Sequence, residues 1–543
     1  MKKVSILRRA GRLVKSIIHD DEKKSQSERR GFSQEQVEKR RKRGRQDRRL
    51  GLDTEIMQET GMTREEIDAK WKRFREMGIL PVSFNLFNLC GLYKMNDEEA
   101  REALLKVKEL KRLEDESRWD FRLVDLGKMS YEEAEEKAKA FKDLYGSLMV
   151  PREQKKIVSK AAYLHPENMS DEEIREIMTD MKFTECILKY NNTGYVSFHF
   201  HEKTIPERRE FVCTKERTMM LSDLNSKESL AILDDKLLTY DALKEFYHRE
   251  MVAISDKDFR RFREFFDRND AAVIKPRFDL MGKGVQLLRK PDDKDMRKAF
   301  HRLVDEYRKF LMEGLIDAAP EVKVLNPDSV NTVRIITYFD GKEATVWSAS
   351  MRIGHVGSFV DNVGAGGLTV TIDTETGVIM SDARDEGGFS YEKHPETGIT
   401  FKGYQLPAWD KAIATAKGLA ASLPDAKFVG WDLACNSDYE WVIVEGNGQT
   451  GFYGAQAPID KGRRKSFLET VGADPSGVIK DLVVYDMAEE VEAETGIPKD
   501  EIVEKLLHFE SLGLDGRYFR PNRAWELSDE ECLALMDKGD KNE

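Results

Sequence analysis

Apolar positions between about residue 225 and residue 470 fall into short runs rich in Val, Ile, Thr and aromatic residues, separated by glycines and helical patterns. Such runs are typical of strands. The predicted strands cover 271–276, 285–288, 330–339, 344–354, 368–373, 427–435 and 441–446, and a helix is predicted near 295–311. This alternation predicts an α+β domain made mainly of antiparallel sheets.

Helical spacing of apolar positions dominates the two ends of the chain, and one helical pattern recurs there. Residues 59–78 (ETGMTREEIDAKWKRFREMG) and 494–513 (ETGIPKDEIVEKLLHFESLG) share Glu, Thr and Gly at their start and Glu, Ile, Lys, Phe and Gly at later aligned positions. Residues 129–146 form a looser copy. Convergent amphipathic patterning explains this middle copy as well as true repetition does, whereas the outer two copies favour repetition.

An acidic helix start follows each copy. In each start an Asn or Ser is followed three positions later by Glu, the capping-box pattern in which both side chains satisfy free N–H groups at a helix N-terminus. We expect helix-loop-helix hairpins that pack Ile67, Trp71 and Phe74, or their equivalents, inward. The starts are NDEEA (96–100), SDEEI (170–174) and SDEEC (528–532).

These patterns divide the 543 residues into four predicted regions. They are a basic amphipathic segment (1–50), a mostly helical accessory region (51–224), a catalytic α+β domain (225–470) and a C-terminal helical hairpin region (471–543). The 35% charged content and mean hydropathy of −0.58 are typical of soluble globular proteins. The chain has five cysteines without C-x-x-C spacing and lacks both a long apolar run and a signal-peptide pattern, so we expect a cytoplasmic protein.

The basic charge is concentrated at the N-terminus. Residues 1–50 hold eighteen Lys or Arg against seven Asp or Glu, a local balance of +11 that leaves −22 for the rest of the chain. The amphipathic segment 2–18 suits the headgroup region of an anionic membrane, at the inner face, and equally suits docking on the protein's own surface. The run 38–49 (EKRRKRGRQDRR) is typical of a solvated linker or of contact with lipid phosphates, and nucleic acid is not an expected partner.

A lysine and a glycine-rich loop form the first candidate for phosphate binding. Lys275 ends a predicted strand and precedes a loop with Gly282, Lys283 and Gly284. Glycines let backbone N–H groups approach phosphate, and lysine supplies a point charge. The spacing is not that of a P-loop, so a simple hairpin with a surface lysine is the alternative. The apolar segment 311–320 that follows, with Glu313 and Asp317, has the character of a linker that can border an adenine, although its composition does not require one.

Two arginines interrupt apolar strands. Arg334 follows Asn331 in VNTVRII, and Arg352 lies in SASMRIG. A buried arginine is costly unless it meets an anion, and its planar fork suits phosphate or carboxylate. A bound phosphate and a salt bridge within the domain are equally good partners for each arginine at this stage.

Three oxygen-bearing side chains come from two predicted strands that are neighbours along the chain. Asp432 follows FVGW, and Glu445 and Asn447 end the run WVIVEGN after a short turn. If these strands form a hairpin, Asp432 and Glu445 meet, and two carboxylates in contact need a proton or a cation between them. Three oxygen donors around one point suit Mg²⁺.

The ordered series of motifs resembles the ATP-grasp superfamily, and in detail the sugar-transfer-associated ATP-grasp family found beside bacterial capsule and exopolysaccharide genes. The series covers about 225–470. It consists of Lys236 in DDKLLTYDAL, Lys275 before its glycine loop, EGLI, NTVRI, DNVGAGG, GWD and VEGN.

The resemblance implies a role for each matching residue. ATP would contact Lys236, Lys275 and the loop of Gly282, Lys283 and Gly284, with Glu313 and Ile316 bordering the adenine and Asp317 facing the ribose. Arg334, Arg352 and Lys275 would act in catalysis at the γ-phosphate. Asp432, Glu445 and Asn447 would hold Mg²⁺, with Mn²⁺ as an alternative. Asp361 and Asn362 match a family pattern whose role the sequence leaves open.

The activity implied by this resemblance is that of an ATP- and Mg²⁺-dependent carboxylate-amine ligase that forms an acyl phosphate. Its partners would be small or carrier-linked carboxylate and amine substrates, in the modification of cell-envelope polysaccharide or peptide. A phosphotransferase acting on a sugar or hydroxyl group is the first alternative. A non-catalytic nucleotide-binding scaffold is the second.

Overall fold

The computed structural model describes residues 57, 60–76, 94–125, 127–148, 161–277, 284–355, 357–358, 361, 366–512, 524–532 and 534. Two compact units are formed. One comprises Glu207–Val478 and the described part of Asp500–Glu543, and the other comprises the described part of Ile17–Pro206 together with Ile479–Lys499. The predicted amphipathic segment 2–18 and basic run 38–49 lie outside the described residues. None of the described helices is both long and apolar enough to cross a membrane.

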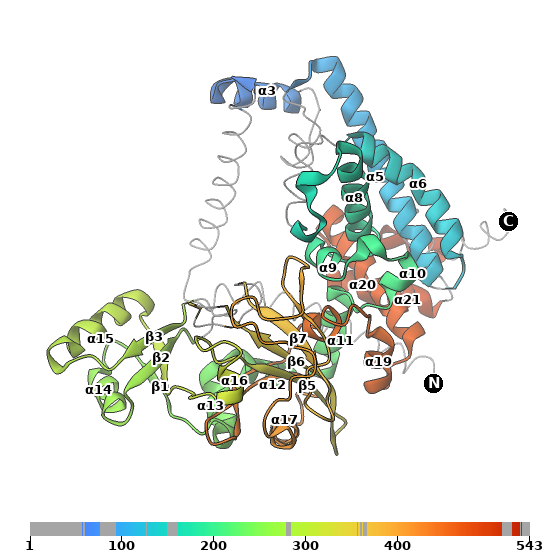
Figure 1. Cartoon of the computed structure of the whole chain (residues 1–543). Coiled ribbons are helices and arrows are strands. Elements are labelled where there is room, and N and C mark those ends of the chain that lie inside the picture. The colour runs from blue at the N-terminus through green and yellow to red at the C-terminus, as the bar shows by residue number, and fades with distance from the viewer. Residues whose placement is uncertain are drawn as a thin grey trace. The chain divides into compact units, whose positions relative to one another are not determined.

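The second unit is helical, and in Figure 1 its N-terminal part is blue to teal and its segment Ile479–Lys499 is orange-red. Neighbouring helices α5 and α6 pack together, and α6 packs on α8. Within this unit the buried Arg118 of α5 forms an ion pair with Glu490 of α20 (Pro475–Thr495). Its other helices are α3 (Arg64–Glu76), α5 (Asp97–Asp125), α6 (Tyr131–Leu148), α8 (Asp171–Cys186) and α9 (Asn192–Ser197), with 3-10 turns at Ala162–Leu164, Pro166–Asn168 and Phe200–Glu202.

The predicted capping boxes are confirmed. Ser170 accepts from the Glu173 backbone N–H, and the Glu173 carboxylate accepts in return from the Ser170 N–H. The same reciprocal bonds join Asn96 with Glu99 and Ser528 with Glu531. The predicted inward packing also holds, because Ile67 and Phe74 of α3 and Ile502 and Phe509 of α21 (Lys499–Ser511) are buried. The Trp71 side chain lies outside the described part.

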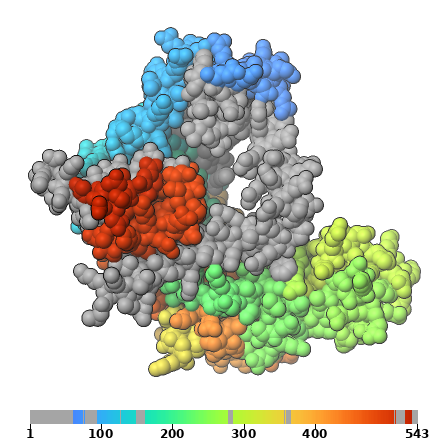
Figure 2. Space-filling model, turned by 180° about the vertical axis from the view of Figure 1, so that it is seen from behind, coloured from blue at the N-terminus to red at the C-terminus, as the bar shows by residue number. Residues whose placement is uncertain are grey.

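A four-stranded antiparallel sheet in the order β1-β4-β2-β3 forms the smaller part of the first unit. One face packs against two amphipathic helices through Phe262, Phe265, Phe300, Ala272 and Ile274. Because side chains alternate along a strand, Lys275 and Glu313 point to the opposite face. Figure 2 shows this part as a rounded yellow-green lobe. Its elements are β1 (Met251–Ile254), α14 (Phe259–Arg268), β2 (Ala271–Lys275), β3 (Gln286–Arg289), α15 (Asp293–Tyr307) and β4 (Phe310–Glu313).

One boundary prediction is wrong in this sheet. The helix expected near 295–311 ends at Tyr307, and 310–313 form β4. Arg308 has a positive φ of 60°, which ends the helix, and all four β4 residues are buried in the sheet. Strand β1 and helix α14 were not predicted. A continuous apolar run resembles the end of a buried helix as much as a strand, so the pattern alone does not separate them.

A seven-stranded antiparallel sheet in the order β11-β10-β5-β6-β7-β8-β9 forms the larger part of this unit. One face packs on α17 and holds Trp431, Leu433, Ile335 and Met351 in the main core. The opposite face carries an aromatic cluster around Phe428 and Trp347 and, farther along the strands, the polar side chains described below. The strands are β5 (Val333–Phe339), β6 (Ala344–Ile353), β7 (Leu368–Ile372), β8 (Ala383–Arg384), β9 (Ser390–Tyr391), β10 (Phe428–Cys435) and β11 (Trp441–Asn447), and α17 spans Trp409–Ser422.

Shorter helices complete the unit. They are α10 (Ile205–Arg209), α11 (Thr214–Leu224), α12 (Lys227–Asp234), α13 (Lys236–Leu243), α16 (Pro320–Lys323), α18 (Tyr453–Gln456) and α19 (Arg464–Thr470), with 3-10 turns at Lys244–Phe246 and Ala524–Glu526. The mixed α+β architecture, with antiparallel sheets and helical N- and C-terminal regions, is the predicted fold class.

Candidate active site

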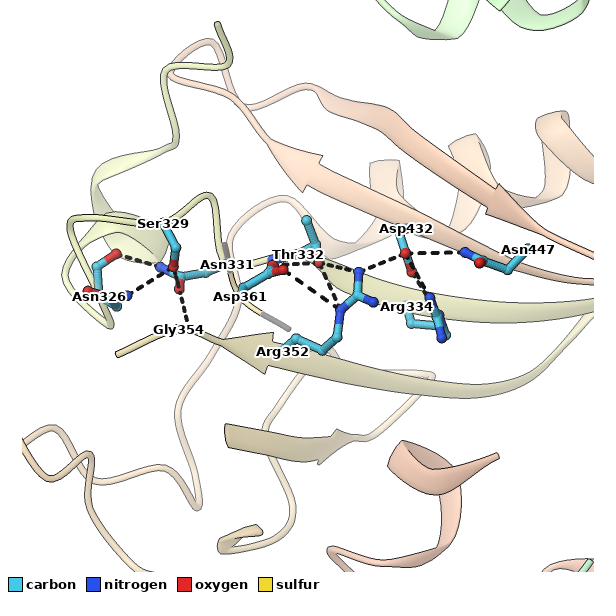
Figure 3. A network of polar contacts seen from close by, with 10 residues as sticks. All are labelled: Asn326, Ser329, Asn331, Thr332, Arg334, Arg352, Gly354, Asp361, Asp432 and Asn447. Atoms are coloured by element: carbon cyan, nitrogen blue, oxygen red, sulfur yellow. Dashed lines mark hydrogen bonds and ion pairs between the residues drawn. The ribbon is translucent and has the colours of Figure 1, made fainter. Parts of the chain in front are cut away.

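A buried carboxylate lies at the centre of the polar face of the larger sheet. Asp432 of β10 is 1% exposed and lies opposite Arg334 of β5. Arg334 Nε and Nη2 donate to Asp432 Oδ1 and Oδ2 at 2.7 and 2.8 Å. Arg352 of β6 reaches the same Oδ2 with Nη2 at 2.7 Å. Two guanidinium groups therefore share one carboxylate (Figure 3), and the Nη1 of each has no partner among the described residues.

A β-bulge directs Glu445 to this face. Asp432 pairs with Glu445 and Leu433 pairs with Ile443, so Val444 is an extra residue on β11. Without the bulge Glu445 would share the face of Ile443, which packs in the core, because side chains two apart on a regular strand point the same way. The predicted contact of Asp432 with Glu445 across a hairpin thus has the expected register, for a reason that the sequence pattern did not reveal.

Asn447 completes the predicted set of oxygen ligands. Its Nδ2 donates to Asp432 Oδ2 at 3.3 Å, which leaves its own Oδ1 for another partner. Glu445 is partly buried, and its carboxylate has no hydrogen-bond or ion-pair partner within the described part of the chain. An unpartnered carboxylate and a carboxamide oxygen beside Asp432 fit a hard cation such as Mg²⁺. Such a cation would compete with Arg334 and Arg352 for the oxygens of Asp432.

A hydroxyl and a second carboxylate orient Arg352. Arg352 Nε and Nη2 donate to Thr332 Oγ1 at 3.2 and 2.8 Å, and this hydroxyl donates to Asp361 Oδ2 at 2.7 Å. The Thr332 backbone N–H also donates to Asp361 Oδ2 at 2.5 Å. Asp361 therefore lies in the same network (Figure 3), whereas its neighbour Asn362 lies outside the described residues. The sequence motif leaves the role of Asp361 open, and no sequence signal marks Thr332.

Electrostatics in this network favour the charged forms. Burial on its own raises the pKa of Asp432, but Arg334 and Arg352 outweigh it and hold that pKa below its ordinary value. Burial on its own lowers the pKa of Arg352, and Asp432 and Asp361 outweigh it and raise that pKa. Asp432 and Arg352 therefore stay ionised at neutral pH.

The Asn331 side chain does not contact Asp432 or the arginines and instead bonds to the turn before β5. Its Nδ2 donates to the carbonyl oxygens of Val322 and Asn326 at 3.1 and 2.7 Å, and its φ is +55°. Its Oδ1 accepts from the Ser329 hydroxyl at 2.7 Å. Asn331 thus fixes the turn that leads into β5.

A second buried cluster lies on the smaller sheet. Glu313 of β4 is 1% exposed and forms ion pairs with Lys275 of β2 and with Arg249. Arg249 Nε donates to Glu313 Oε1 at 2.7 Å. The two cations outweigh burial and hold the pKa of Glu313 below its ordinary value. The predicted phosphate lysine is therefore held by the residue predicted to border the adenine, and Arg249 was not predicted.

The other predicted nucleotide residues occupy separate elements of the same unit. Lys236 is the first residue of α13, after Asp235, which caps that helix and pairs with Arg277. Gly282 and Lys283 lie outside the described residues, and Gly284 has a φ of +73°. The remaining two, Ile316 and Asp317, follow β4. The Ile316 side chain is partly buried, whereas Asp317 is exposed and faces Lys323 at 3.4 Å.

Comparison with known protein families finds one match to the part of the chain that holds these clusters. Residues 215–472 match the model of the sugar-transfer associated ATP-grasp family, which covers a little under half of the chain. These residues belong to that family. Both clusters described above lie inside the ATP-grasp domain, and its extent agrees with the span of about 225–470 over which the sequence motifs resemble the family.

Solved structures similar to this chain are ATP-grasp enzymes of low identity. An N5-carboxyaminoimidazole ribonucleotide synthetase in its ADP complex is 15% identical, with a TM-score of 0.28, over 42% of this chain and 48% of that one. The match thus spans about half the length of that enzyme. VanG D-Ala:D-Ser ligase from Enterococcus faecalis is 11% identical, with a TM-score of 0.29, over 49% of this chain and 67% of that one.

A third similar structure, D-alanyl-alanine synthetase A from Vibrio cholerae, is 12% identical, with a TM-score of 0.29, over 49% of this chain and 70% of that one. At these scores the likeness assigns no role to any residue of the ATP-grasp domain. Among curated proteins, no match was found.

The Thr332 hydroxyl gives a testable link between Asp361 and Arg352. Thr332→Val removes the acceptor for two guanidinium N–H groups, and hydrogen bonds to charged groups contribute about 1.5–3 kcal/mol. We expect ATP turnover in the ATP-grasp domain to fall about ten- to hundredfold while the Kd for ADP changes little. Steady-state ADP release and calorimetric ADP binding measure the two quantities. Thr332→Ser, which keeps the hydroxyl, serves as the control, and equal turnover in both variants would contradict the link.

Proposed function

We propose that this protein is an ATP- and Mg²⁺-dependent ligase that joins a carboxylate to an amine through an acyl phosphate. The observation that carries the proposal is the pairing of two arginines with the buried Asp432 beside Glu445, which has no hydrogen-bond or ion-pair partner among the described residues. Phosphoryl transfer needs little covalent chemistry from the protein and depends on positioning and charge neutralisation. Arginines with free N–H groups next to candidate metal ligands are suited to that task.

The chain's residues would divide the work as follows. Arg334 and Arg352 would direct their Nη1 groups at the γ-phosphoryl oxygens while Asp432 keeps both guanidinium groups in place. Lys275, held by Glu313, would bind phosphate from the smaller sheet, with Lys236 as a second contact. Glu445 and Asn447, together with Asp432, would hold Mg²⁺, which when bound neutralises phosphate charge.

Two bond exchanges would complete the reaction. A carboxylate oxygen of the acid substrate bonds to the γ-phosphorus, and the bond from that phosphorus to the β,γ-bridging oxygen breaks to release ADP. The amine nitrogen then bonds to the acyl carbon, inorganic phosphate leaves, and the nitrogen loses a proton. The family description supports a substrate connected with sugar transfer, and the acid and the amine are the open parts of the proposal.

A coupled ADP assay over a matrix of acids and amines tests the ligase proposal. A ligase releases ADP at a sustained rate only when both an acid and an amine are present, and the product carries their new amide bond. Glu445→Gln is the matched control. It removes a predicted metal ligand that has no hydrogen-bond or ion-pair partner among the described residues, so the variant should fold normally and lose ADP release. ADP release with a hydroxyl acceptor alone, and a phosphorylated product, would establish a phosphotransferase instead.

A further inference from the structure

Arg217 is a cation at the edge of the candidate active site that pairs with no carboxylate of the described residues. It lies on α11, and its Nη1 donates to the carbonyl oxygens of Gln449 and Thr450 at 2.7 and 2.8 Å. These two residues come just after Asn447, the last residue of β11. Within the described part of the chain, Arg217 Nε and Nη2 have no partner.

Two acids near Arg217, Glu216 and Asp432, are engaged with other arginines. The neighbouring Glu216 is buried and accepts from Arg464 Nε at 2.7 Å. Asp432 is shared by Arg334 and Arg352. Burial and the positive charge of Arg334 both lower the pKa of Arg217. A partly buried guanidinium without a counter-ion is unfavourable, so an anion that reached it would be bound with a net gain.

Arg217 and Arg334 border the same stretch of backbone. Gly430 of β10 lies two residues before Asp432, on the same face of the sheet. A Cβ at Gly430 would lie 2.2 Å from Thr450 Oγ1 and 3.3 Å from Arg334 Cδ, so the glycine allows the Thr450 segment to lie against the sheet beside Arg334. Arg217 donates to that segment, and the sheet order β11-β10-β5-β6 places Arg334 between this edge and Arg352.

We propose that Arg217 binds an anionic group of the second substrate, a carboxylate or a phosphate, next to the site of phosphoryl transfer. The inference rests on the proposed function. It assigns the nucleotide phosphates to Arg334, Arg352 and Lys275 and leaves Arg217 for the partner molecule. The Nε and Nη2 edge of its guanidinium has the geometry for bidentate pairing with such a group.

Binding of small anions to the full chain tests this site. Arg217→Gln keeps a donor for the Gln449 and Thr450 carbonyls and removes the charge. Malonate serves as the carboxylate probe and inorganic phosphate as the phosphate probe, each titrated calorimetrically in saturating ADP and Mg²⁺. We expect the variant to raise the Kd of one probe or both at least tenfold, while the Kd for ADP with Mg²⁺ stays within about twofold.

Arg463→Met is the matched control, because Arg463 is also partly buried without a carboxylate partner, with its Nη2 on the Trp347 carbonyl oxygen at 3.0 Å. It should leave the affinity for both probes unchanged. If Arg217→Gln does not fold, Arg217→Lys decides, because a single ammonium does not reproduce bidentate pairing and should still raise the Kd several-fold.

Four results would overturn the site. They are unchanged affinity in the Arg217 variants, an equal loss in Arg463→Met, a loss confined to ADP, and failure of the wild type to bind either probe. Charge-dependent anion binding without any ADP release across the acid and amine matrix would uphold the site and reject the ligase. Ligase activity that Arg217→Gln leaves unchanged would uphold the ligase and reject the anion site at Arg217.

Discussion

Asp432→Asn is expected to give the largest combined loss of stability and activity of any single substitution in the ATP-grasp domain. The variant leaves the partly buried Arg334 and Arg352 beside a neutral amide, and removing one partner of a buried ion pair costs about 3–5 kcal/mol. ADP release should fall at least a hundredfold, because both arginines lose their orientation and a metal ligand disappears. Urea unfolding and the coupled ADP assay measure the two effects.

Glu445→Gln separates the two effects of the Asp432 substitution. Glu445 is partly buried and has no hydrogen-bond or ion-pair partner within the described residues, so its variant should keep the free energy of unfolding within about 0.5 kcal/mol while ADP release falls. Full ADP release in both variants would reject the proposed metal site and the ligase with it. A normal unfolding free energy for Asp432→Asn would show that the two arginines do not depend on this carboxylate.

The stabilisation by Asp432 should depend on pH in a defined direction. The folded-state pKa of Asp432 lies below its ordinary value of 3.8, so the carboxylate binds a proton less readily in the folded protein than in the unfolded chain. Its contribution is complete above pH 3.8 and is lost as the pH falls through the lowered folded-state pKa. The difference in unfolding free energy between the wild type and Asp432→Asn should therefore be constant near neutral pH and shrink below about pH 4.

Local patterns predicted the strands of the larger sheet well because each strand carries its own signal. The runs 330–339 and 441–446 became β5 and β11, because β-branched and aromatic residues suit a pleated, buried surface. The capping boxes held for a similar reason, since donor and acceptor lie three positions apart. Helix α15 was predicted too long because its end depends on one backbone angle at Arg308.

The sequence predicted most of the residues of the candidate site but not which of them contact one another. The strand pattern around Arg334 and Arg352 suits a salt bridge and a bound phosphate equally. The structure shows the salt bridge, to Asp432, which is 98 residues from Arg334. Register and bulges decide which strand residues share a face. The bulge at Val444 is one such feature that the sequence does not show, because nothing in WVIVEGN marks this residue as the one that directs Glu445 to the polar side chains.

Glu313→Gln is expected to destabilise the smaller sheet nearly as strongly as Asp432→Asn destabilises the larger one. Glu313 neutralises Lys275 and Arg249, and both cations are themselves largely buried. Leaving two cations without their carboxylate should lower the local stability of β1, β2 and β4 by about 3–5 kcal/mol. Hydrogen exchange of the amides in these strands measures that free energy directly, which matters because a chain of two units need not unfold in one step.

Nucleotide binding should weaken in the same Glu313 variant, because Lys275 loses the partner that holds its ammonium group in place. Glu250→Gln is the matched control, since Glu250 pairs with the exposed Arg268 and exposed pairs contribute about 0–1 kcal/mol. Exchange rates in Glu313→Gln equal to those in Glu250→Gln would mean that the buried pairs do not stabilise the sheet. Slower exchange with intact ADP binding would mean that the carboxylate costs more to bury than its two partners return, as happens when an apolar core replaces a buried ion pair.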